Sequence, residues 1–370
     1  MQTATKRRFD PNSPAIKEYL HDVYDRTFTT EGTMVAFPTC LPGMTIPIVH
    51  DESRITAMDV VSDGTVYGGT SGRQAHLFIG CFHRLSGMVL DIGHPSGATD
   101  CAAVCCGESK FAAFVNGPRG GRAISGPIMN LAGEDLIQEW GFELPKITDV
   151  GECVAGEPVV HAVADAARKM AVGVTSRHLF TLEFGSPKVR VVGEAPGSGR
   201  IAAAANGEIF GRDEGGTLWS FDAAKQAIRR RAVKLPDGFG DAALGWAKDP
   251  RSGLLYTADA QGRLFSFDPA KGFSSPLGGT PLTPVGPMSV TFDGRLFGFC
   301  GDEIAKMFCY DPGRREVSNL GVAASVLERR RYGYVFGDAV TGRDGEVIFG
   351  ENDNGGHVWL YFPRIQAARA

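Results

Sequence analysis

The stretch GLLYTADAQGRLFSFDPAKG (residues 253–272) contains two short apolar strands joined by a glycine turn, and the second strand ends in an aromatic residue and Asp. Glycine is frequent throughout the chain, with 49 glycines in 370 residues, nearly twice the usual frequency of about 7%. An interior helical glycine costs roughly 0.5–1 kcal/mol relative to alanine. The sequence therefore predicts an all-β protein with many short strands and tight turns.

The same pattern returns along the chain. Its copies begin at Thr65, Lys110, Lys169, Gly207, Gly253, Gly294 and Gly345. The second strand of each pair starts near residues 76, 123, 178, 217, 263, 306 and 357. An apolar strand precedes each pair and a fourth strand follows most of them. Four strands in roughly 45 residues, repeated seven times, predict a seven-bladed β-propeller of four-stranded antiparallel blades.

The last repeat lacks a fourth strand of its own. We predict that an N-terminal strand, from MVAFPTC (residues 34–40) or MTIPIVH (residues 44–50), supplies it and closes the ring. The predicted organisation is an N-terminal arm over residues 1–30, with a short helix over 14–25, and one propeller domain over 31–370. A ring of six or eight blades is the alternative, because the copy from Lys110 is degenerate and the stretch from Leu131 to Cys153 is long.

Charge and composition narrow the classes of partner. The net charge of −4 gives no general attraction to nucleic acid. No run of apolar residues is long enough to span a membrane, and none follows Lys6, Arg7 and Arg8 as a secretory signal would require. We expect a cytoplasmic location for the sequence as written, or a secreted or periplasmic one if a signal has been removed. We also expect a monomer and reduced, buried cysteines, since no C-x-x-C pair occurs.

Candidate functional side chains gather on the propeller face that carries the loops between second and third strands. His76, His178 and His357 occupy the same position at the start of a third strand, and His161 lies in an inner strand. Further candidates from these loops, the loop before the last inner strand and the fifth inner strand are Arg73, Arg119, Arg122, Arg177, Arg212, Asn352, Arg331, Tyr332, Tyr334 and Trp246. The alternative for each is structural: a histidine that bonds a neighbouring loop, or an arginine paired with a carboxylate.

Several segments resemble one family of propeller enzymes. TSGRQAHLFIG (residues 70–80), TLWSFDAAK (217–225), RLFSFDPAKG (263–272) and TGRDGEVIFGENDNGGHVWLYFP (341–363) resemble the seven-bladed propeller polysaccharide lyases, of the ulvan lyase and rhamnose–glucuronate lyase type. The resemblance covers residues 55–363. It implies β-elimination beside a uronic acid in an anionic oligo- or polysaccharide.

The resemblance also implies roles for the candidates. A positive charge neutralises the uronate carboxylate, a base removes the proton on C5, and an acid protonates the leaving oxygen. By this interpretation His161 or His178 is the base, Tyr332 or Tyr334 the acid, and Arg177 or Arg331 the neutralising cation. The residues expected to bind substrate are Arg73, His76, Arg119, Arg122, Arg177, Arg212, Trp246, Asn352 and His357.

Two other functions stay open at this point. One is a propeller that binds a glycan or a protein without catalysis. The other is a hydrolase or lactonase that uses a divalent ion, Ca²⁺ or Zn²⁺, held by His and Asp or Glu at the channel mouth. The lyase requires no cofactor. No G-x-S-x-G, P-loop or H-E-x-x-H motif occurs.

Overall fold

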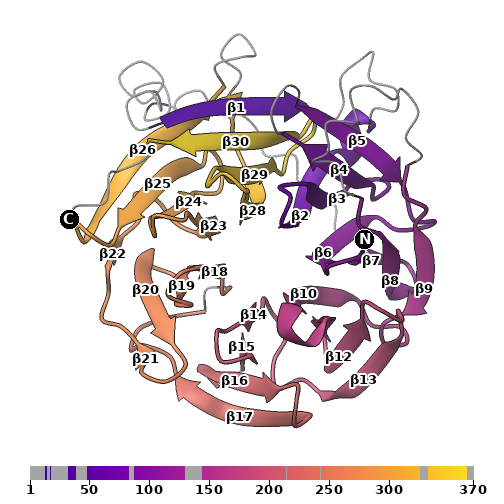
Figure 1. Ribbon diagram of the computed structural model, residues 1–370. Helices are drawn as coiled ribbons and strands as arrows, with labels where there is room; N and C mark the ends of the chain where they lie inside the picture. The colour runs from indigo at the N-terminus through magenta and orange to yellow at the C-terminus, as the bar shows by residue number, and fades with distance from the viewer. Residues whose placement is uncertain are drawn as a thin grey trace.

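Seven antiparallel sheets stand radially around a central channel in the computed structural model (Figure 1). The structure describes residues 13, 14, 17, 32–38, 48–82, 87–129, 144–213, 215–241, 243–325 and 332–364. The predicted all-β, seven-bladed propeller is confirmed. Within these residues no helix is long and apolar enough to cross a membrane. The predicted arm over 1–30, with its helix, falls almost entirely outside the described residues.

Each blade runs from an inner strand at the channel to an outer strand at the rim. Blade 1 holds β2 (Arg54–Val60), β3 (Val66–Ser71), β4 (Leu77–Cys81) and β5 (Met88–Gly93). Blade 2 holds β6 (Asp100–Cys106), β7 (Lys110–Gly117), β8 (Gly120–Pro127) and β9 (Thr148–Glu152). Blade 3 holds β10 (Val159–Asp165), β11 (Met170–Thr175), β12 (His178–Glu183) and β13 (Val189–Glu194). Blade 4 holds β14 (Ala202–Ala203), β15 (Glu208–Arg212), β16 (Thr217–Asp222) and β17 (Ala227–Lys234).

The remaining blades vary at their outer edges. In blade 5, β18 (Ala247–Lys248), β19 (Leu255–Ala258) and β20 (Arg263–Asp268) are followed by β21 (Gly272–Phe273) and β22 (Gly278–Gly279), which both pair with β20. Blade 6 holds β23 (Val285–Val290), β24 (Leu296–Cys300), β25 (Lys306–Asp311), β26 (Glu316–Ala324) and the short β27 (Tyr332–Gly333). Blade 7 holds β28 (Phe336–Thr341), β29 (Val347–Glu351), β30 (His357–Pro363) and β1 (Gly32–Pro38). Short 3₁₀ helices cover His50–Glu52 and Ala166–Arg168.

The first strand closes the ring, as the sequence predicts. β1 pairs with β30 along its whole length, from Gly32 opposite Pro363 to Pro38 opposite His357. Of the two stretches considered, MVAFPTC therefore contributes to the closing strand, whereas the end of MTIPIVH leads into blade 1. Because β1 and β30 lie at opposite ends of the chain, their pairing holds the first and last blades together.

Glycines within strands allow aromatic rings to lie flat on the neighbouring strand. Gly173 faces Phe180 and Gly211 faces Trp219 across the second and third strands of blades 3 and 4. A Cβ at either glycine would lie 2.2 Å or 2.4 Å from the ring opposite. Both rings are fully buried. Part of the glycine excess therefore serves packing between strands and not turns, which the sequence pattern alone did not distinguish.

A repeated bulge shapes the outer strands. In blades 1, 2 and 6 it carries Asp or Asn, an aliphatic residue and glycine, at residues 91–93, 149–151 and 319–321. The glycine N–H donates a hydrogen bond of 2.8–2.9 Å to the Asp or Asn side chain, and the glycine has a positive φ. Such a bulge bends the strand and increases its twist, which protects a free sheet edge.

Candidate functional site

The central channel contains a cavity of about 300 Å³. Small residues of the inner strands, such as Ala103, Ala162 and Ala203, leave this space open. The charged and hydrogen-bonding side chains that line it are Thr56, Asp59, His161, Arg200, Trp246, Lys248 and Asp338, from blades 1, 3, 4, 5 and 7. The cavity therefore collects polar groups from most of the ring.

Arg200 spans the channel. It lies two residues before β14, whereas its partners belong to β28, on the opposite side of the ring in Figure 1. Its Nη2 donates a hydrogen bond of 3.1 Å to the Gly337 carbonyl, and its Nη1 lies 3.8 Å from Asp338 Oδ1. The Arg200 side chain remains 39% exposed, so its guanidinium is accessible to a ligand in the cavity.

The two aspartates of the cavity connect neighbouring inner strands. Asp338 Oδ2 accepts the N–H of Met58 at 2.7 Å, and Asp59 Oδ2 accepts the N–H of Cys106 at 2.7 Å. The other oxygen of each carboxylate accepts the N–H of the residue that follows it. Burial raises both pKa values, and the nearby Asp338 charge contributes to the increase at Asp59, whose pKa rises to about 6. These carboxylates are therefore already engaged in joining blades.

His161 is a neutral hydrogen-bond donor. Its Nδ1 accepts the N–H of Ile201 at 3.3 Å, so the ring proton resides on Nε2. Burial, with a smaller contribution from the Arg200 charge, lowers the pKa of His161 to about 3. An imidazole in this state is a poor acceptor for a substrate proton, which argues against the role of base that the resemblance implied.

Two groups from blade 5 complete the cavity. The indole Nε1–H of Trp246 is buried and has no hydrogen-bond partner among the described residues. Burial lowers the pKa of the Lys248 ammonium, against the opposing effect of the Asp165 charge. A buried donor without a partner costs free energy unless a ligand satisfies it. Trp246 therefore adds an unsatisfied donor to the residues that line this cavity.

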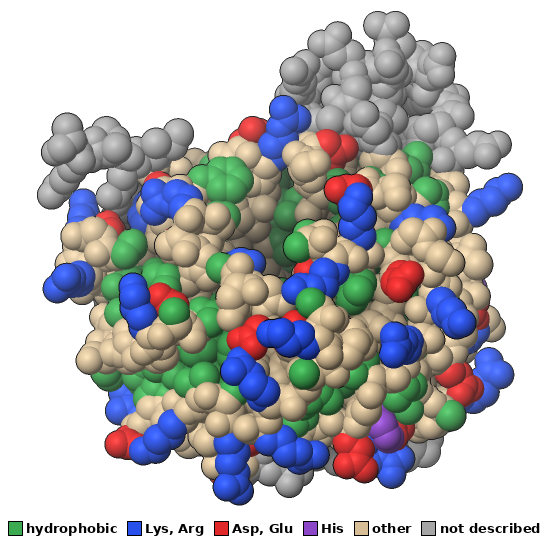
Figure 2. All heavy atoms as spheres, turned by 60° about the horizontal axis from the view of Figure 1, so that its bottom comes forward, with side chains coloured by type: hydrophobic (Ala, Val, Ile, Leu, Met, Phe, Trp, Pro, Cys, Tyr) green, Lys and Arg blue, Asp and Glu red, His purple; other side chains and the backbone are tan. Residues whose placement is uncertain are grey.

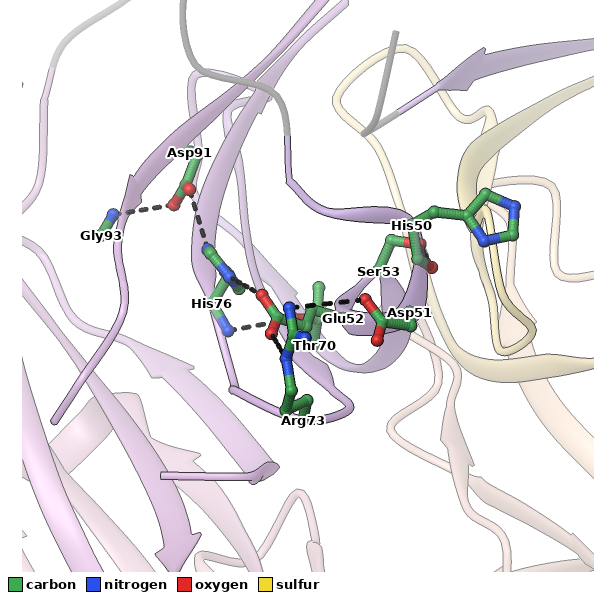
Figure 3. Close-up of polar contacts among 9 residues, drawn as sticks. All are labelled: His50, Asp51, Glu52, Ser53, Thr70, Arg73, His76, Asp91 and Gly93. Carbon is green, nitrogen blue, oxygen red and sulfur yellow. Dashed lines mark hydrogen bonds and ion pairs between the residues drawn. The ribbon is translucent and has the colours of Figure 1, made fainter. Parts of the chain in front are cut away.

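His76 lies in a buried network within blade 1 (Figure 3). Its Nδ1 is 2.8 Å from Asp91 and its Nε2 is 3.0 Å from Glu52, whose carboxylate also accepts Nε of Arg73 at 2.8 Å. The His76 N–H donates to Thr70 Oγ1 at 3.0 Å. Burial opposes the charged form, but the hydrogen bonds to Asp91 and Glu52 outweigh it and raise the pKa of His76.

Blade 3 repeats this arrangement. His178 Nδ1 lies 2.9 Å from Glu157, which also accepts Nε of Arg177 at 3.0 Å, and the His178 N–H donates to Thr175 Oγ1 at 2.8 Å. In blade 7, the buried His357 lies 3.0 Å from Glu351. The three equivalent histidines therefore each contact a carboxylate of their own blade, and none lines the channel cavity.

The other predicted residues lie around the rim of the face. Arg73 and Arg177 are exposed apart from their carboxylate contacts. Arg122 pairs with Asp149, Arg212 donates to the Gly240 carbonyl at 2.6 Å, and Arg119 is exposed on a turn. The main-chain N–H of Asn352 donates to Val335. Tyr332 belongs to β27 and Tyr334 is 39% exposed, while Arg331 falls outside the described residues.

The cavity thus contains two of the predicted residues, His161 and Trp246. Sequence reasoning missed Arg200, Lys248, Asp59 and Asp338. The signal that could have found them is a charged residue in or beside an inner strand of small apolar residues, as in RIAAAA, WAKD, AMDVV and FGDAV.

The arrangement of possible metal ligands bears on the alternative hydrolase. Among the residues that the structure describes, no group of three or more His, Cys, Asp or Glu side chains is placed to hold a metal ion. The seven described cysteines are free thiols. Burial raises the pKa of the Cys81 and Cys153 thiols to about 12, so both are protonated at neutral pH.

Comparisons with known proteins support the fold. The chain matches no family model and no curated protein. It is similar to virginiamycin B lyase from Staphylococcus aureus, with a TM-score of 0.62 and 10% identity over 90% of this chain and 99% of that one. A catalytically inactive histidine-to-alanine variant of the same enzyme, solved with quinupristin, has a TM-score of 0.61, 10% identity and the same coverage. The WD40 propeller domain of Doa1 has a TM-score of 0.54 and 11% identity over 90% of this chain and 99% of that one. None of these proteins is a polysaccharide lyase, so the likeness extends to the propeller and not to that family.

Proposed function

We propose that the channel cavity is the active site of a lyase that acts on an anionic oligosaccharide at its reducing-end uronate, which carries the preceding sugar on O4. The observation that carries this proposal is the excess of hydrogen-bond donors over free acceptors in the cavity. Arg200, Lys248, the Nε2–H of His161 and the unpartnered Nε1–H of Trp246 line it. Its carboxylates are already bonded to backbone N–H groups. Such a set favours a ligand rich in negatively charged oxygen.

The size of the cavity limits how many sugar rings of the substrate it can hold. Ligand sites commonly span roughly 300–1,000 Å³, and this cavity, at about 300 Å³, lies at the lower limit. One sugar ring suits this space better than several consecutive rings. The proposed substrate is therefore the end of an oligosaccharide and not the interior of a polymer.

The elimination can be assigned to residues of the cavity. The Arg200 guanidinium binds the uronate carboxylate, which makes the proton on C5 more acidic. The Lys248 amine takes that proton, the C5–H electrons form the C4–C5 double bond, and the C4–O bond breaks with its electrons on oxygen. The Lys248 ammonium then returns the proton to the leaving oxygen. His161 and Trp246 donate hydrogen bonds to sugar oxygens.

Lysine suits the role of base because its pKa falls readily on desolvation, and partial desolvation lowers the pKa of Lys248. Lys248 also replaces His178, Tyr332 and Tyr334 in this proposal, since these side chains do not line the cavity. The similar virginiamycin B lyase supports lyase chemistry on a propeller in general terms, because its histidine variant is inactive.

The test is incubation with oligosaccharides that end in different uronates, followed by ultraviolet absorbance of the conjugated double bond. We expect product with the wild type and with Lys271→Met, a control in the same blade whose side chain is 84% exposed. Lys248→Met is expected to reduce the rate by about 10²-fold or more. Wild-type activity in Lys248→Met, or no product from any substrate, would overturn the proposal.

A non-catalytic binding propeller is the second candidate, favoured by the similarity to a WD40 propeller domain. The same oligosaccharides distinguish a binding propeller from a lyase. Calorimetric binding of an oligosaccharide that is lost in Arg200→Met, without any unsaturated product, would establish binding alone. The metal-dependent hydrolase has no corresponding ligand cluster among the described side chains, and no step is assigned to a metal.

A further inference from the structure

The outer strand of blade 4 departs from the repeat. Where three other outer strands carry Asp or Asn, an aliphatic residue and glycine, β17 carries Arg229, Arg230 and Arg231. Its bulge is also larger. Ser220 pairs with Arg229 and Leu218 with Val233, so one residue of β16 faces three of β17. A local departure from an otherwise repeated rule indicates a functional or strained position.

The backbone does not account for the arginines. Arg231 has a φ of 51°, in the left-handed region where glycine or asparagine fits with less strain. The exposed Arg230 makes no ion pair with a described residue. Arg229 contacts Glu208 and Ser220 but keeps 60% of its side chain exposed. The bulge therefore presents charged groups outward.

Basic residues continue from this strand onto blade 3. Lys188 and Arg190, at the start of β13, are exposed and make no ion pair with a described residue. Figure 2 turns this side of the ring toward the reader and shows many Lys and Arg side chains with fewer Asp and Glu. We name Lys188, Arg190, Arg229, Arg230 and Arg231 the basic rim. It exists although the whole chain has a net charge of −4.

Protection of a free sheet edge does not explain the basic rim. Charged residues and bulges both protect outer strands from pairing with other chains. Here the outer strand β5 has the bulge and no exposed charged side chain. The bulge is therefore sufficient at that edge, and the three consecutive arginines of β17 require another reason.

We propose that the basic rim binds the chain of a polyuronate polysaccharide, outside the channel. The choice of polyuronate rests on the proposed function. Guanidinium groups pair with carboxylates in a bidentate manner. β17 exposes no large apolar or aromatic side chain, whereas proteins that bind single-stranded nucleic acid stack bases on aromatic rings. In Figure 1, β17 lies at the rim and β14 at the channel of the same blade, so the rim would hold a long chain whose end enters the cavity.

The test compares two arginine pairs with the same backbone geometry. Arg230→Gln combined with Arg231→Asn removes two of the five rim charges and keeps, at position 231, a residue that tolerates a positive φ. The control is Arg314→Gln with Arg315→Asn, a second exposed pair in blade 6 in which Arg315 has a φ of 56°. Affinity for fluorescently labelled polygalacturonate is measured by anisotropy at several salt concentrations. We expect the rim variant to bind about tenfold more weakly with a shallower salt dependence, and the control to match the wild type.

Failure of polysaccharide binding by the basic rim can be distinguished from failure of the proposed lyase activity. Equal affinity of the rim variant and the wild type for polygalacturonate would refute the proposal that the basic rim binds this polysaccharide. Tighter binding of duplex DNA of equal charge, lost in the same variant, overturns the polysaccharide as its partner. Turnover of a disaccharide with a terminal uronate is expected to be unchanged in the rim variant, because this substrate reaches only the cavity. If no uronate is turned over but the rim variant binds polygalacturonate more weakly than the wild type, the proposed lyase activity is refuted and polysaccharide binding by the basic rim is supported.

Discussion

The state of His161 provides a quantitative test of the channel. His161 accepts a hydrogen bond from Ile201 and has a pKa of about 3, against an ordinary value of 6.5. Between these two values the unfolded chain binds a proton that the folded protein does not bind. Stability therefore falls as the pH decreases below 6.5. The perturbation is a change from pH 7 to pH 5 in the wild type and in His161→Asn, whose side-chain oxygen can still accept the Ile201 N–H.

The expected magnitude follows from the interval between pH 6.5 and 5. One unit corresponds to about 1.4 kcal/mol, so the wild type loses about 2 kcal/mol through His161. Asp59 acts in the opposite direction, because its pKa is raised from 3.8 to about 6. Glu52 and Glu157 have lowered pKa values and remain ionised at pH 5. These contributions are common to both proteins and cancel in the comparison.

Urea unfolding at both pH values supplies the free energies. The wild type is expected to lose about 2 kcal/mol more than His161→Asn between pH 7 and pH 5. Equal losses in the two proteins would show that the folded state protonates His161 without cost. That result would refute both the neutral state of the half-buried His161 imidazole and its assignment as a donor in the cavity.

Three further changes test other parts of the structure. Gly337→Ala places a Cβ 2.3 Å from the Ile55 carbonyl and is expected to cost about 1–3 kcal/mol in urea unfolding, whereas Gly279→Ala, with open space around its Cβ, changes little. Asp59→Asn removes a carboxyl group whose pKa is raised to about 6, so as the pH rises from 4 to 6 its stability should increase relative to that of the wild type; parallel pH profiles of the two proteins would contradict the raised pKa. Glu157→Gln removes the charge that the arginine and histidine of blade 3 share, and a cost of about 1–3 kcal/mol is expected by thermal unfolding; no change would mean that this network contributes nothing to stability.

The fold was accessible from the sequence because a blade is mostly a local structure. Each blade pairs strands that follow one another in the chain, and turns separate them at regular intervals. Closure is different, since β1 pairs with β30 from the other end of the chain. The last repeat indicated a missing strand, but two N-terminal stretches had the required apolar pattern. Only the pairing in the closed ring distinguishes them.

The site was harder to predict than the fold. The sequence indicates which residues lie in loops, whereas the closed ring determines which residues line the channel. His76 and His178 look equivalent in sequence and are equivalent in structure, but Glu52 and Glu157, two residues before their inner strands, fold against them. The repeated histidine position therefore marks a histidine–carboxylate contact that blades 1 and 3 share.

Arg200 is the opposite case, because no repeated pattern points to it and yet it lines the cavity. It precedes an unremarkable stretch of alanines, yet it meets Gly337 from a distant blade because both lie at the channel. In a closed ring, residues in or beside the inner strands converge on one axis whatever their separation in sequence. A charge at that position, as at Arg200 and Lys248, is therefore a better guide to a channel site than a charge in a longer loop at the rim.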